Sequence, residues 1–119
     1  MPFSERDWKH LRALQATALD RYCERILDES SAIIQDTTHS SHDRYLRLFS
    51  LLQERNAEMA AAFDDVRRST AVRRLAAMLG LGVLTEQELS GFNADVRETA
   101  TGLGDLFAPR GERDRRRRR

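Results

Sequence analysis

Residues 44–72 contain no glycine or proline, and apolar side chains recur there at steps of three and four residues. This spacing predicts an amphipathic α-helix, because residues three and four apart share a face. About thirty residues of helix measure about 45 Å, well beyond the average for globular proteins. A helix this long must find cover along its whole apolar stripe. The stripe, which includes one asparagine, consists of Tyr45, Leu48, Phe49, Leu52, Asn56, Met59, Phe63 and Val66.

A second long helix is predicted ahead of it, from Ser4 to about Gln35. Ser4 is a suitable N-cap, and Asp7 places an acid in the first turn. Residues 36–43, DTTHSSHD, are rich in side chains that compete for backbone hydrogen bonds and favour turns. We therefore expect an antiparallel hairpin of two long helices. The apolar face of the first helix is broad and consists of Trp8, Leu11, Leu14, Ala18, Leu19, Tyr22, Cys23, Ile26, Leu27, Ile33 and Ile34.

Short helices are predicted after the hairpin. The apolar phase changes past Thr70, so residues 72–79 form either a continuation of the second helix or a new helix bent from it. Thr85 and Glu88 form a capping box, and Asn93 is the N-cap of another short helix. The fold class is therefore all-α, with the hairpin and the short C-terminal helices in one domain over residues 1–107. Helix ends are expected at Gly80, Gly82, Gly102 and Gly104.

The segment RRLAAMLGLGVLTEQELSGF, residues 73–92, is similar to the short C-terminal domain found at the ends of many bacterial proteins. The shared features are a leucine helix, a glycine turn and a second helix opened by an LTEEEF-like motif. The resemblance covers about twenty residues of the 119. In that family the motif is associated with oligomerisation.

Self-association also follows from the length of the hairpin. The short C-terminal helices can cover only one end of it, and a lone helix pair buries too little apolar surface to offset the ordering of its residues. A second copy that supplies two more helices predicts a homodimeric four-helix bundle. Asn56 either fixes the register of that bundle by hydrogen bonding or lies at its edge and reaches water. The expected partner-binding residues are Tyr45, Leu48, Leu52, Asn56, Met59 and Phe63.

Charge is distributed unevenly along the chain, although the formal net charge is only +1. Residues 108–119 hold seven arginines against two acids, a net charge of +5, and are expected to be disordered. Residues 1–107 hold 13 basic and 17 acidic groups, a net charge of −4. Contact with nucleic acid is therefore expected only through the tail, which could bind phosphates or an acidic partner, or have no selected role. The arginines concerned are Arg115, Arg116, Arg117, Arg118 and Arg119.

Motifs for catalysis are lacking, since the sequence has no glycine-rich phosphate loop and no recognisable triad. His39 and His42 with Asp36 and Asp43 are the one candidate for a metal site. Nothing completes their ligand set, so a polar capping loop is the preferred interpretation. We expect no catalytic residue, no metal and no cofactor.

A polar cluster lies where the helix phase changes, in AFDDVRRSTA at residues 62–71. Its acids are Asp64 and Asp65, and its arginines, Arg67 and Arg68, could bind a carboxylate or a phosphate of a partner. The preferred interpretation is a bend held by pairs between these acids and arginines and by capping from Ser69 or Thr70.

No run of about eighteen apolar residues occurs, so no membrane span is expected. The single cysteine, Cys23, fits a reducing compartment, and the preference for arginine over lysine suggests a bacterial source. We interpret the chain as a cytoplasmic, non-enzymatic helical dimerisation or interaction module. The alternatives are a nucleic-acid-associated accessory protein that acts through the arginine tail and, third, a ligand- or metal-binding helical bundle.

Overall fold

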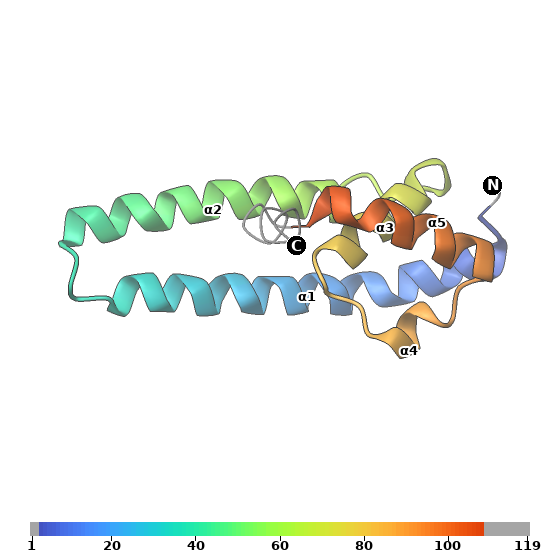
Figure 1. The fold of residues 1–119 in the computed structure, drawn as a ribbon, viewed down its shortest axis with the longest axis horizontal. Coiled ribbons are helices and arrows are strands. Elements are labelled where there is room, and N and C mark those ends of the chain that lie inside the picture. The colour runs from blue at the N-terminus through green and yellow to red at the C-terminus, as the bar shows by residue number, and fades with distance from the viewer. Residues whose placement is uncertain (1–2, 109–119) are drawn as a thin grey trace.

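The computed structural model describes residues 3–108, and these residues contain helices and no strand. Figure 1 shows two long helices side by side, with the short helices gathered at the end of the pair that lies away from the connecting loop. The all-α prediction is thereby confirmed for the described part of the chain. The helices are α1 (Glu5–Gln35), α2 (Ser41–Phe63), α3 (Ala71–Gly80), α4 (Glu86–Leu89) and α5 (Ala94–Gly104), with 3₁₀ turns at Arg68–Thr70 and Asp105–Phe107.

Serine caps open both helices of the hairpin. The Ser4 hydroxyl accepts a hydrogen bond from the Asp7 backbone N–H (3.0 Å), and the Ser40 hydroxyl accepts one from the Asp43 backbone N–H (3.0 Å). Each bond satisfies one of the N–H groups that have no partner within the helix. The 31 residues of α1 then continue to Gln35 as predicted.

The second helix is shorter than predicted, because α2 ends at Phe63 and seven residues, 64–70, separate it from α3, the last three of them in a 3₁₀ turn. Asp64 is extended, and Asp65 takes a left-handed backbone with φ 52. The Thr70 hydroxyl holds this segment: it donates to the Asp65 carbonyl oxygen (2.7 Å) and accepts from the Arg67 backbone N–H (3.0 Å). A continuous helix through residue 72 is therefore wrong, and α3 is a new helix, which was the other alternative predicted for this segment.

The core lies where α3 and α5 pack against the hairpin. Leu11, Leu75, Met78, Val83 and Val96 are among its largest fully buried side chains.

A close backbone approach joins the end of α3 to the end of α5. A Cβ on Gly80 would lie 2.3 Å from the Gly104 carbonyl oxygen, so this contact requires glycine. α5 ends at Gly104 as predicted, with Gly102 two residues inside the helix.

Polar side chains of α1 hold the C-terminal elements in place. Arg21 pairs with Glu88 (2.6 Å) and donates to the Val83 carbonyl oxygen (3.0 Å), and Arg25 donates to the Leu81 carbonyl oxygen (2.6 Å). The hydrogen bond from Arg21, together with that from the Thr85 backbone, lowers the pKa of Glu88 to about 2. One flank of α1 is thus tied to residues 81–88.

Candidate protein-interaction face

Exposed apolar side chains gather on the half of the hairpin nearest the loop. Of the seven large hydrophobic side chains that are exposed among residues 3–108, only Leu106 lies outside the hairpin. The other six are exposed to between 39% and 69%: Leu27, Ile34, Tyr45, Leu46, Phe49 and Leu52. Figure 1 shows no C-terminal helix against this end of the pair.

The contact between α1 and α2 follows a line that differs from the predicted stripe. On α2 it runs through half-buried Leu48, Leu51 and Arg55 to Ala62, which has no exposed surface. The predicted residues Tyr45, Leu52 and Asn56 are exposed. Leu52 and Asn56 each follow a contact residue by one position, and Tyr45 lies one turn before Phe49, which also does so. All three therefore lie about 100° round the helix from this line. Leu48, Met59 and Phe63 are only partly buried.

Leu27, Ile34, Phe49 and Leu52 all project from the same side of the hairpin. Each directly follows a residue that faces the other helix, namely Ile26, Ile33, Leu48 and Leu51. The two helices have the same hand and opposite directions, so a step of one residue turns both toward the same side. We call Leu27, Ile34, Tyr45, Phe49 and Leu52 the apolar flank.

The opposite flank is where the C-terminal elements attach. Arg21 and Arg25, which contact residues 81–88, directly precede the contact residues Tyr22 and Ile26. A step back of one residue turns to the side away from the apolar flank. The C-terminal helices therefore leave the apolar flank uncovered along the half of the hairpin near the loop.

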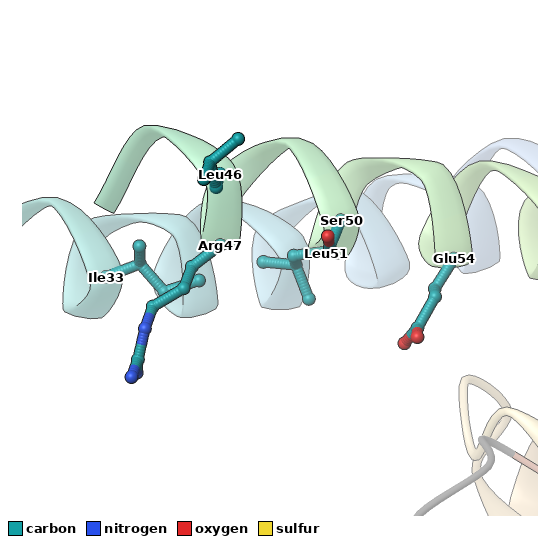
Figure 2. A pocket seen from close by; sticks show the side chains of 6 residues that line it. All are labelled: Ile33, Leu46, Arg47, Ser50, Leu51 and Glu54. Atoms are coloured by element: carbon teal, nitrogen blue, oxygen red, sulfur yellow. The ribbon is translucent and has the colours of Figure 1, made fainter. Parts of the chain in front are cut away.

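A hollow of about 450 Å³ lies on that opposite flank, near the loop end. Figure 2 shows Arg47 and Glu54 extending to the same side of α2, one on each side of Leu51, with Ile33 contributed by α1. Arg47 also donates to Asp43 (3.0 Å). The side chain of Glu54 is exposed to solvent. It therefore lacks the partly desolvated surroundings that a general acid or base requires.

A polar network that the sequence analysis missed lies between the two long helices. Arg55 pairs with Glu29 (3.0 Å) and Glu58 (2.9 Å), and the Tyr22 hydroxyl donates to Glu58. Burial, reinforced by the hydrogen bond to Glu58, raises the pKa of Tyr22 well above its ordinary value. The sequence feature that could have predicted this network is the spacing of Arg55 and Glu58, which lie three residues apart on α2 and so can pair on one face of the helix.

The loop histidines do not come together as a ligand set. His39 makes hydrogen bonds with Asp36 (3.0 Å) and Arg47 (2.6 Å), whereas His42 is exposed. Hydrogen bonds from Thr38 hold the pKa of Asp36 below its ordinary value. Within residues 3–108, no group of three or more His, Cys, Asp and Glu side chains is placed to hold a metal ion.

The predicted polar cluster is divided between two contacts. Arg67 pairs with Asp65 (2.8 Å), while Arg68 pairs with Glu5 at the start of α1. Asp64 caps the end of α2 and is exposed. These four residues therefore do not converge on one binding point. The five terminal arginines, Arg115 to Arg119, lie outside the described residues.

Comparison of the chain with models of known families, with characterised proteins and with solved structures finds no match. In the part of the chain that the structure covers, no helix is both long and apolar enough to cross a bilayer.

Proposed function

We propose that the protein is a non-enzymatic interaction module that forms a homodimer through the apolar flank. Two hairpins joined by this flank make a four-helix bundle, with the C-terminal helices of each copy on the outside. The observation that carries the proposal is the exposure of five large apolar side chains on one flank of a hairpin whose other flank holds the C-terminal elements.

The area available supports a dimer. A fully exposed side chain of this size presents roughly 150–200 Å², so five of them at these exposures offer about 500 Å² per copy. Two copies remove about 1,000 Å² before the surrounding polar residues are counted, which approaches the 1,200–2,000 Å² or so of specific interfaces. A contiguous apolar patch of this size often marks an interaction site.

Light scattering during size exclusion tests the proposal. We expect a mass of twice 13.7 kDa at micromolar concentration. Phe49→Glu, which puts a charge in the centre of the apolar flank, should give the single-chain mass because a desolvated, unpaired charge opposes association. Leu106→Glu is the matched control, since Leu106 is exposed to 68% in the 3₁₀ turn Asp105–Phe107, outside the apolar flank, and its change should leave the dimer intact. A wild-type protein that stays monomeric throughout the micromolar range refutes the dimer.

A second candidate function is binding of nucleic acid through the arginine tail. It is supported by the segregation of charge, because +5 lies in residues 108–119 and −4 in the rest of the chain. Contacts of this kind release counterions and weaken with salt. Deletion of residues 110–119 should abolish retention on nucleic acid at low salt. Equal retention with and without the tail eliminates this candidate.

A further inference from the structure

We propose that the two copies pack in antiparallel order, so that α2 lies along the partner's α2 and α1 along the partner's α1. This inference rests on the dimer proposed above. The twofold axis then lies at the height between Ser50 and Leu51. It places Phe49 against the partner's Leu52 and Tyr45 against the partner's Asn56.

The spacing of exposed residues on α2 is the same in both chain directions. Tyr45, Phe49, Leu52 and Asn56 follow one another by four, three and four residues. An antiparallel copy therefore presents its side chains at the same four heights, as a self-complementary interface requires. Phe49 and Leu52, exposed to 53% and 39%, meet at the centre.

The first helix repeats this spacing about the same height. Half-buried Cys23, exposed Leu27, buried Ser30 and exposed Ile34 also follow one another by four, three and four residues.

Two contacts across the hairpin relate the heights of the helices. Tyr22 bonds to Glu58, and Arg44 donates to the Ile34 carbonyl oxygen. These contacts place the midpoint of residues 23–34 of α1 at the same height along the hairpin as the Ser50–Leu51 peptide bond of α2. One twofold axis therefore serves both helices.

Asn56 distinguishes this order from a parallel one, in which α1 lies along the partner's α2. Each order sets one apolar side chain at the height of the partner's buried Ser30, namely Phe49 in the parallel order and Leu27 in the antiparallel order. The parallel order sets Asn56 at the height of the partner's Cys23, whose thiol is a weak hydrogen-bonding group. The antiparallel order lets the Tyr45 hydroxyl donate to the amide oxygen of the partner's Asn56. A hydrogen bond there removes the cost of burying the amide.

A cysteine introduced at position 34 tests the order directly. Positions 23 and 34 are eleven residues apart on one helix, about 16 Å, so no disulfide can form between them within a chain. We expect Ile34→Cys, with the native Cys23 present, to give a covalent dimer on mild oxidation. Its linked peptides should join position 34 to the partner's Cys23. Ile34→Cys/Cys23→Ser is the matched control and should give no covalent dimer, because antiparallel order also keeps the two positions 34 about 16 Å apart along the bundle.

Spin labels give a second readout that does not depend on oxidation. A label at exposed position 42, in His42→Cys/Cys23→Ser, should lie about 25 Å along the bundle from its counterpart in antiparallel order and at the same height in parallel order. The long distance supports the proposal, with or without the cross-link. A dimer whose labels lie at the same height overturns antiparallel packing and leaves the dimer standing. A monomer by light scattering overturns both.

Discussion

Among single residues, Asp7 links the start of α1 to the start of α5. Its side chain has no exposed surface, and its carboxylate accepts hydrogen bonds from the Asn93 backbone N–H and side-chain amide, both at 2.9 Å. The Ser4 hydroxyl adds a third (2.8 Å). Burial by itself raises the pKa of Asp7, but the hydrogen bonds from Asn93 and Ser4 outweigh it and hold the pKa below its ordinary value. The start of α1 is thereby fixed to the start of α5.

We expect Asp7→Asn to lower the free energy of unfolding by about 1–3 kcal/mol at pH 7, because an amide cannot accept all these bonds as a carboxylate does. Because folding lowers the pKa of this carboxyl group, the group stabilises the fold at pH values above its ordinary pKa of about 4. That stabilisation is lost as the pH falls through the pKa of the folded state. Urea denaturation from pH 7 down to pH 3 should therefore show the difference between wild type and variant shrinking below about pH 4. Asp28→Asn, at an exposed position on the same helix, is the control. A variant as stable as wild type at pH 7 contradicts this account of Asp7.

At the scale of elements, local chemistry was enough to predict where helices begin. Ser4 and Thr85 accept the backbone hydrogen bonds expected of caps, because a cap involves only residues three positions away. The change of apolar phase past Thr70 predicted a bend there, but the end of α2 at Phe63 was not predictable from local chemistry. The turn at Asp65 contains no glycine or proline, and it depends on Thr70, which lies five residues further on.

The orientation of the apolar stripe also lay beyond the sequence. Periodicity predicted that Tyr45, Leu52 and Asn56 share a face, and the structure agrees. It could not show that Leu48 and Arg55, rather than this face, lie against α1. That choice shows only in contacts between residues far apart in the sequence, such as the pair of Arg55 with Glu29 on α1.

The break after α2 supplies a prediction for this scale. The backbone of Asp65 is left-handed, with a φ of 52°, and residues other than glycine adopt this conformation at a cost in free energy. Its neighbour Asp64 has an ordinary φ of −83°. We expect Asp65→Gly to raise the free energy of unfolding by up to about 1 kcal/mol, and Asp64→Gly to lower it by about 0.5–1 kcal/mol. Thermal unfolding of the two variants beside wild type measures both. If the two glycines act in the same direction, backbone strain at Asp65 is refuted.

In the whole molecule, stability is expected to differ between the two ends of the hairpin. Near α3 and α5 the long helices share a core that includes Leu11, Leu75 and Val96. Among residues 3–108, each helix near the loop has only the other for support, and a helix pair without further packing opens locally at low cost. A second copy on the apolar flank would supply the missing contacts to that end alone.

Hydrogen exchange should therefore respond to protein concentration in one region of the chain. We expect amides of residues 27–52 to become at least several-fold more protected between about 1 and 100 µM, since association stabilises only the segments that it covers. Amides of α3 should change much less, because the core around Leu75 is complete within one copy. Phe49→Glu should remove the concentration dependence and leave α3 protected, which separates loss of association from loss of folding. Protection of residues 27–52 that is independent of concentration would mean that the hairpin end is stable by itself, and the physical reason for a dimer would disappear.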